Sequence, residues 1–150
     1  MPQRPIHCLN LALVFTLLLC GSLSAEAQLA TITVQVRNPD PASGTAEVSL
    51  FNSAESFMRE PFLQQSGTFG EDENSAPVFT AVFVAVPTGE YAVVVAHDAN
   101  DNGQLDGGFL GFGGEDYGWS NNVHPWFGWP DFDDAKFTVE ADTEIDISLE

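Results

Sequence analysis

Residues 78–96 read VFTAVFVAVPTGEYAVVVA, and this stretch decides the fold class. Two apolar runs, residues 78–86 and 91–96, flank the turn residues Pro87-Thr88-Gly89. β-Branched and aromatic residues dominate both runs, as is typical of strands. Apolar side chains occupy both the odd and the even positions of each run. Both faces of each strand are therefore expected to be buried. The stretch therefore predicts two strands near the middle of a packed sheet, joined by a tight turn.

The flanking segments extend the β pattern in both directions. Apolar and polar residues alternate in four further segments, which are residues 31–37, 45–50, 137–139 and 144–149. Asn52 and Glu55 are spaced to cap one short helical turn over residues 53–58, and no longer helix is indicated. Residues 98–134 are rich in Gly, Asn, Asp and Trp and lack strand periodicity. About seven short strands predict an all-β, antiparallel β-sandwich of transthyretin-like or immunoglobulin-like type, with this stretch as one long loop.

The first 27 residues have the features of a cleavable signal peptide. An apolar run from Leu11 to Cys20 is followed by Ala25 and Ala27 in the small-x-small pattern. The run is too short to span a membrane as a helix, which takes about 20 apolar residues. Lipidation of Cys20 is an alternative, although Leu19 stands where a lipobox has a small residue. We therefore predict export to the periplasm or the medium, and a single β-sandwich domain over residues 28–150.

The exported domain is strongly acidic and has no cysteine. The whole chain carries 22 Asp and Glu against 4 Lys and Arg, a net charge of −18, and the leader removes one residue of each sign. Both cysteines, Cys8 and Cys20, lie in the leader, so the domain is expected to fold without a disulfide. Nucleic acids and anionic membrane surfaces would be repelled. The expected partner is an unidentified component of the cell envelope or the extracellular space.

Several motifs resemble those of known families. Residues 86–93 resemble the P-x-G-x-Y corner of transthyretin-like and collagen-adhesin B-type sandwiches. Residues 89–92, 97–106, 117–122 and 132–137 together resemble the bacterial family called domain of unknown function 2141, across essentially all of residues 28–150. This resemblance implies an exported sandwich domain. It implies no activity, so it supplies no catalytic residue.

The segment that follows residue 97 resembles a calcium-binding loop. Oxygen-bearing side chains recur at every second residue, as in positions 1, 3, 5 and 9 of an EF-hand loop, and Gly103 occupies position 6. The predicted ligands are Asp98, Asn100, Asn102, the Gln104 carbonyl and Asp106, with Glu115 or Asp116 as an additional carboxylate. Position 12 is Phe109 instead of Glu, and two ligands are neutral, so a Kd of about 10⁻⁴–10⁻³ M is expected. The alternative is a metal-free loop capped by its own side chains.

Two further sites are weaker candidates. His97 and His124, with Asp98 and Asp106, are candidate ligands of a transition metal, but no His-x-His spacing supports this. Trp119, Trp126 and Trp129 gather in one loop, where they would either stack on a sugar or cover the open end of the sandwich as part of the core.

No enzymatic motif is present. The sequence has no nucleophile elbow and no phosphate-binding glycine loop, and Lys136 is the only lysine. Adjacent carboxylates such as Asp133 and Asp134 would suit a hydrolase, but they are more typical of a solvated acidic face. We therefore expect a non-enzymatic binding or structural domain. Carbohydrate or envelope-polymer binding through the aromatic loop is the alternative, and a hydrolase is less favoured.

Overall fold

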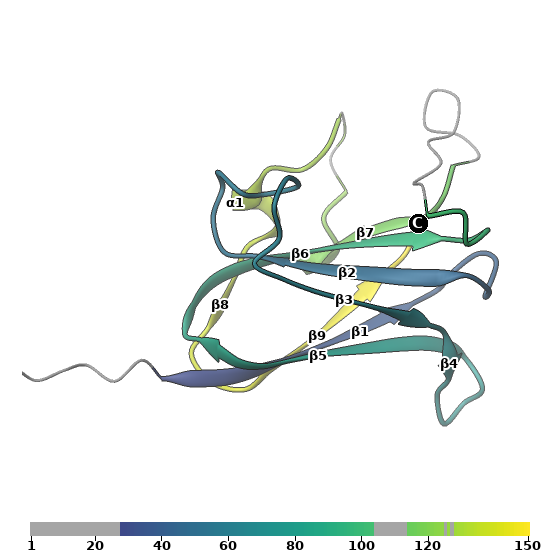
Figure 1. The fold of residues 1–150 in the computed structure, drawn as a ribbon, viewed down its shortest axis with the longest axis horizontal. Helices are drawn as coiled ribbons and strands as arrows, with labels where there is room; N and C mark the ends of the chain where they lie inside the picture. Colours follow the sequence, from purple (N-terminus) through teal and green to yellow (C-terminus); the bar gives the residue numbers. More distant parts are fainter. Residues whose placement is uncertain (1–27, 104–113, 125, 127) are drawn as a thin grey trace, which may run out of the picture.

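The computed structural model describes residues 28–103, 114–124, 126 and 128–150, which form two β-sheets packed face to face (Figure 1). The strands are β1 (Leu29–Arg37), β2 (Thr45–Phe51), β3 (Leu63–Thr68), β4 (Gly70–Glu71), β5 (Pro77–Pro87), β6 (Gly89–Asp98), β7 (Tyr117–Trp119), β8 (Phe137–Val139) and β9 (Thr143–Ser148). A 3-10 turn, η1 (Ser120–Asn122), and a short helix, α1 (Phe132–Ala135), complete the described elements. None of these helical elements is long and apolar enough to cross a membrane.

The predicted all-β sandwich is confirmed, with two differences in detail. The first sheet has the order β4-β5-β1-β9, and the second has the order β3-β2-β6-β7, with β8 also paired to β6. The described residues contain nine strands where about seven were expected, because β4 and β7 are too short for a periodicity to register. The sandwich is also not purely antiparallel. Strand β9 pairs with β1 in parallel, since the chain returns from the second sheet to run beside its first strand.

Alternate residues of both sheets meet in one core. The inward positions of β1 are Ile32, Val34 and Val36, which are completely buried, as the alternation predicted. Val48 and Val95 face them from the second sheet. With no cysteine among the described residues, this interdigitated apolar layer has to supply the cohesion of the sandwich.

Two-sided burial was predicted for both runs of the 78–96 stretch, and only the second run has it. Ala92, Val93 and Val95 are buried on opposite faces of β6, which lies inside the second sheet. On β5, by contrast, Val82 and Val84 are 39% and 68% exposed. The prediction is wrong there because no described element packs on the outer face of the first sheet.

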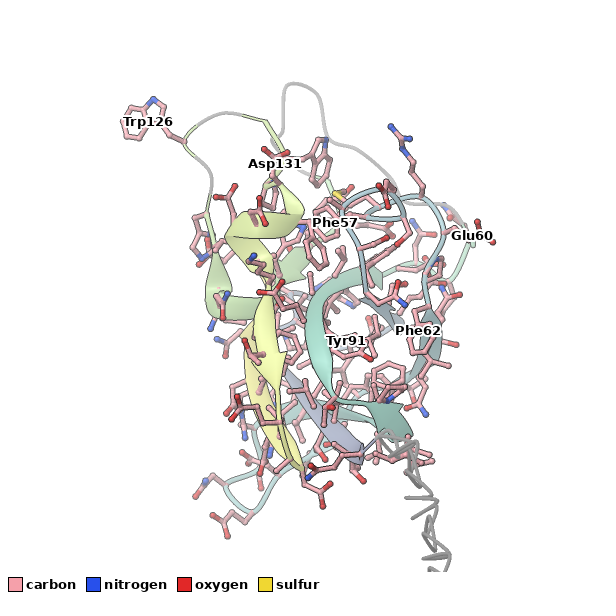
Figure 2. The ribbon with its side chains drawn as sticks, turned by 90° about the vertical axis from the view of Figure 1, so that its left-hand side faces the viewer. Phe57, Glu60, Phe62, Tyr91, Trp126 and Asp131 are labelled. Atoms are coloured by element: carbon pink, nitrogen blue, oxygen red, sulfur yellow. The ribbon has the colours of Figure 1, made fainter. Side chains whose placement is uncertain are left out.

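A smaller apolar cluster covers part of the outer face of the second sheet. Phe51 and Ala92 of the sheet are buried against Phe132 and Ala135 of α1, and Phe57 packs edge-on against the rings of Phe51 and Phe132. Figure 2 shows Phe57 beside this helix. The segment around Phe57 is a hydrogen-bonded turn, where the sequence predicted one short helical turn.

Local hydrogen bonds explain that difference. The Ser53 hydroxyl accepts the Ser56 backbone N–H at 3.3 Å, so Ser53 caps a turn instead of the predicted pair Asn52 and Glu55.

Tyr91 closes the corner between β5 and β6. Its hydroxyl donates a hydrogen bond to the Pro87 carbonyl at 2.7 Å, across the tight turn that the sequence predicted. Its ring is buried, and this burial raises the pKa of Tyr91 above that of a free phenol. Phe62, from the segment before β3, lies against the same ring (Figure 2). A tyrosine of this kind ties a crossing loop to the end of a sandwich.

Candidate functional site: the Asp98 loop and the neighbouring aromatic cluster

The predicted calcium loop begins where β6 ends. The two carboxylate oxygens of Asp98 accept the backbone N–H groups of Asn102 and Gly103, at 3.1 and 2.7 Å. The side-chain oxygen of Asn100 accepts the same Asn102 N–H at 3.0 Å. Oxygens of two predicted ligands, Asp98 and Asn100, therefore converge on one point of the loop. The backbone between them is bent so that Gly103 has a φ of 73°, a left-handed conformation that suits glycine.

The environment of Asp98 favours its ionised form. Partial burial opposes ionisation, but hydrogen bonds from the backbone N–H groups of residues 100–103 outweigh it. The pKa of Asp98 is therefore held below its usual range. The Asp98 carboxyl group therefore loses its proton more readily than that of a free aspartate.

This lowered pKa leads to a prediction about acid stability. A depressed folded-state pKa contributes stability that is present above the ordinary Asp pKa and is lost as pH falls through the folded-state value. Asp98→Asn keeps the shape and loses the charge, so its melting temperature should fall short of the wild-type value most at pH 7 and least near pH 3. Glu60→Gln, at an exposed position, is the control for simply removing one negative charge. A deficit that does not change with pH would contradict the assignment.

Of the two candidates for an additional carboxylate, the structure brings only Glu115 to the loop. Glu115 is 8% exposed, and its Oε1 accepts the Ala99 backbone N–H at 2.9 Å. Asp116 faces elsewhere. Its Oδ2 accepts the Asp40 backbone N–H at 2.9 Å and lies 3.7 Å from Nδ1 of His97.

The remaining predicted ligands, Gln104 and Asp106, lie outside the described residues. Within the described residues, no group of three or more His, Cys, Asp or Glu side chains is placed to hold a metal ion. Asp101 is turned away from the centre of the loop, because its Oδ1 accepts the Thr45 hydroxyl at 2.8 Å. Any ion at this loop would therefore depend on amide and backbone oxygens as well as on carboxylates.

The two histidines have separate surroundings. His97 is completely buried, and its Nε2 lies 2.6 Å from the Ser43 carbonyl, so Nε2 carries the hydrogen. His124 has a half-exposed side chain and lies 3.2 Å from a carboxylate oxygen of Glu150. His97 is thus hydrogen bonded locally, close to the end of β6.

The three tryptophans do not form one cluster. The rings of Trp119 and Tyr117 are nearly parallel, at 10°, with their centroids 6.2 Å apart. Trp129 packs edge-on against both rings, at 5.0 Å from Tyr117 and 5.6 Å from Trp119, and remains 55% exposed. Trp126 is fully exposed and points away from the rest of the molecule (Figure 2).

Tyr117 was missed by the sequence reasoning. It belongs to the cluster because β7 pairs with β6, which sets Tyr117 opposite Ala96 and Trp119 opposite Val94. Burial and then the nearby charge of Glu115 raise the pKa of Tyr117. Because Glu115 precedes Tyr117 by two residues and accepts the Ala99 N–H, the aromatic cluster borders the Asp98 loop. Trp119 also packs against the small core under α1, so it serves both the core and the cluster.

Comparison with known proteins identifies a family and no characterised relative. The family model described as "Uncharacterized protein conserved in bacteria (DUF2141)" matches residues 34–147. This match confirms the resemblance noted in the sequence. No curated protein and no solved structure matches the chain.

Proposed function

The chain belongs to the DUF2141 family of uncharacterised bacterial proteins, and we propose that it is an exported, non-enzymatic binding domain whose Asp98 loop holds one calcium ion. Export to the periplasm or the medium is supported by the leader-like residues 1–27. The observation that carries the calcium proposal is the convergence of the Asp98 and Asn100 oxygens at the start of a DxNxNG loop.

Calcium suits the donor set of this loop. Hard divalent cations take six or more oxygen ligands, and carboxylates, amides and backbone carbonyls all serve. Asp98, Asn100 and Asn102 would contribute side-chain oxygens, and the Gln104 carbonyl and Asp106 would complete the set. Glu115, whose carboxylate contacts Ala99, is the preferred additional ligand over Asp116. With two neutral amides among the ligands, the expected Kd stays at about 10⁻⁴–10⁻³ M.

The Asp98 and Asn100 oxygens also accept backbone N–H groups of the loop, which support its bend. The ion would chiefly reduce repulsion between carboxylates in a chain of net charge −18. Calcium is thus proposed as a stabilising ligand of the domain. A hydrolase is the less favoured alternative, and turnover in a hydrolase screen that is lost in a Glu115→Gln variant would support it.

A thermal melt tests the calcium proposal. Every strand and helix that the structure describes lies within residues 28–150, so this segment carries the described fold. We expect 10 mM calcium to raise its melting temperature by several degrees, since an ion at roughly 10–100 times its Kd adds about 1.4–2.7 kcal/mol. Magnesium at the same ionic strength should give a much smaller rise.

The variants have to separate ligation from loop capping. Asp98→Asn alone is expected to destabilise the metal-free domain, because Asp98 accepts two backbone hydrogen bonds. The informative quantity is therefore the calcium-induced rise in melting temperature, which Asp98→Asn should abolish. Asp101→Asn is the matched control, since Asp101 bonds to Thr45 and is outside the proposed ligand set. An equal rise in wild type and Asp98→Asn would refute the site.

A further inference from the structure

The outer face of the second sheet forms an open, four-strand floor. Cross-strand partners in an antiparallel sheet point to the same face. Two rows of such partners cross from β7 through β6 and β2 to β3. The first row is Tyr117, Ala96, Glu47 and Ser66, and the second is Trp119, Val94, Ser49 and Gln64. The residues between them, such as Val48 and Val95, face the core, so both rows lie on the opposite side.

This floor lies between raised segments. In Figure 1 the segment between β2 and β3 and the chain around α1 rise above the second sheet on one side, and residues 99–103 follow β6 on the other. At the loop end, a hollow of about 640 Å³ is lined by Asp98, Asp101 and Gly103 together with Glu47 and Ala96. A second hollow of about 350 Å³ shares Glu47 and Ala96 and reaches Met58 and Arg59.

A third hollow continues the same surface. It has a volume of about 460 Å³, shares Met58 and Arg59 with the second, and reaches the exposed ring of Trp129. The three hollows are thus linked by common lining residues into one groove that runs along β2 and β6. Four strands at the usual spacing give it a floor about 14 Å wide.

The chemistry of the groove is that of a sugar-binding surface. Apolar positions Val94 and Ala96 and the rings of Tyr117, Trp119 and Trp129 lie on one side. Hydroxyl, amide and carboxylate groups of Ser66, Gln64 and Glu47 lie on the other. A pyranose ring has a face of C–H groups and a rim of hydroxyls, which these two sides match. Ligand sites typically combine apolar and aromatic surface with a few polar groups in this way.

The charges select among polysaccharides. Among their described lining residues, the three hollows present the carboxylates of Glu47, Asp98, Asp101, Asp131 and Asp133 and one cation, Arg59, so a polyanion would be repelled. If calcium occupies the loop, it offsets the charge of Asp98. In the hollow at the middle of the groove, Glu47 and Arg59 are the charged residues described, and their charges cancel. This favours an uncharged ligand.

We propose that this groove binds a segment of an uncharged, linear polysaccharide, with Trp129 and Glu47 as ligand-contacting residues. The proposal deepens the binding function proposed above and rests on it for the class of protein and for the neutralised loop. The ligand lies along the strands, with its C–H faces toward the aromatic side of the groove and its hydroxyls toward β2 and β3.

Isothermal titration of residues 28–150 with cellohexaose, xylohexaose and mannohexaose, in calcium and in chelator, tests the proposal. At least one of these sugars should bind, and Trp129→Ala should weaken that binding about tenfold, the scale of one lost aromatic contact. Glu47→Gln should weaken it several-fold. Trp126→Ala is the matched control, because this exposed ring lies outside the groove and its loss should leave Kd unchanged.

Three results would overturn the proposal. They are no binding of any uncharged hexasaccharide by folded protein, equal effects of Trp126→Ala and Trp129→Ala, and binding only of the polycationic control, a chitosan hexasaccharide. The calcium melt is read separately. A calcium-specific rise in melting temperature without sugar binding refutes the proposed sugar groove and supports the proposed calcium loop. Sugar binding of equal affinity in calcium and in chelator, with no calcium-induced rise in melting temperature, supports the proposed sugar groove and refutes the proposed calcium loop.

Discussion

Replacing Ser120 with alanine is expected to destabilise the domain by about 3 kcal/mol, because two buried backbone groups lose their partner. Ser120 is completely buried. Its hydroxyl oxygen accepts the Val93 N–H at 2.9 Å and donates to the Ala135 carbonyl at 2.5 Å. One small side chain thereby joins the central strand β6 to helix α1.

The position of Ser120 explains why the effect should be large. On the side of β6 that faces away from β2, strand β7 pairs with residues 94–96 and strand β8 pairs with residues 89–91. Ser120 occupies the gap between these two short strands and satisfies the N–H of Val93 that neither strand reaches. Alanine removes the hydroxyl, so the Val93 N–H and the Ala135 carbonyl both lose this partner.

Chemical denaturation measures this prediction. The midpoint should fall with an unchanged slope, since the surface exposed on unfolding stays the same. Ser66→Ala, at an exposed position of β3, is the control and should shift stability by less than about 0.5 kcal/mol. A Ser120→Ala variant as stable as this control would mean that the two backbone groups find other partners.

Ser120 also illustrates the limit of the sequence. Its partners are 27 and 15 residues away, and no local pattern marks a serine as a bridge between distant backbone groups. The alternation of Ile32, Val34 and Val36, by contrast, correctly predicted a strand and its buried face, because strand periodicity is local. The sandwich and its longer strands were predictable for that reason.

Local pattern failed where a second layer decides burial. Val82 and Val84 have the same side chains as the buried valines of β6, yet they are exposed, because nothing described covers the outer face of the first sheet. Hydrophobicity reports what a residue would favour and not which elements are available to cover it.

The candidate site was predictable to a similar extent. The spacing of Asp98, Asn100 and Asn102 is local and is visible in sequence, whereas the choice between Glu115 and Asp116 is not. These two residues are adjacent just before β7, and their side chains diverge. Only the packing shows that Glu115 contacts Ala99 while Asp116 contacts Asp40. The groove was similarly hidden, since Glu47 and Ser66 join the aromatic residues only through strand register.

Gly118 should be the least tolerant position of the aromatic edge. A Cβ atom at this position would lie 2.5 Å from Cγ2 of Ile147 and 3.1 Å from the Ser148 carbonyl oxygen. Ile147 is completely buried and β-branched, so it has no spare rotamer to move into. Gly118→Ala should therefore destabilise the domain by about 3 kcal/mol, the upper part of the range for overpacking a core.

The glycine is needed because the two sheets meet here. Tyr117 and Glu150 exchange backbone hydrogen bonds at 3.2 and 3.1 Å, so β7 of the second sheet also pairs with the chain that follows β9 of the first. This closure holds β7 close to Ile147 and leaves no space for a side chain between them. The rings of Tyr117 and Trp119, on either side of Gly118, are thereby fixed on the outer face. Displacing β7 should disturb the aromatic cluster together with stability.

A double-mutant cycle with Ile147→Ala tests the cause. Ile147→Ala alone should cost about 2–5 kcal/mol through its cavity, but it removes the methyl group that the new Cβ would strike. The double variant should therefore be more stable than the sum of the two single effects implies, by at least about 1 kcal/mol. Gly70→Ala is the control, because its nearest neighbour would be 4.0 Å away and its effect should be small. Additive effects would show that the added methyl group at residue 118 is accommodated by moving β7, and not by contact with Ile147.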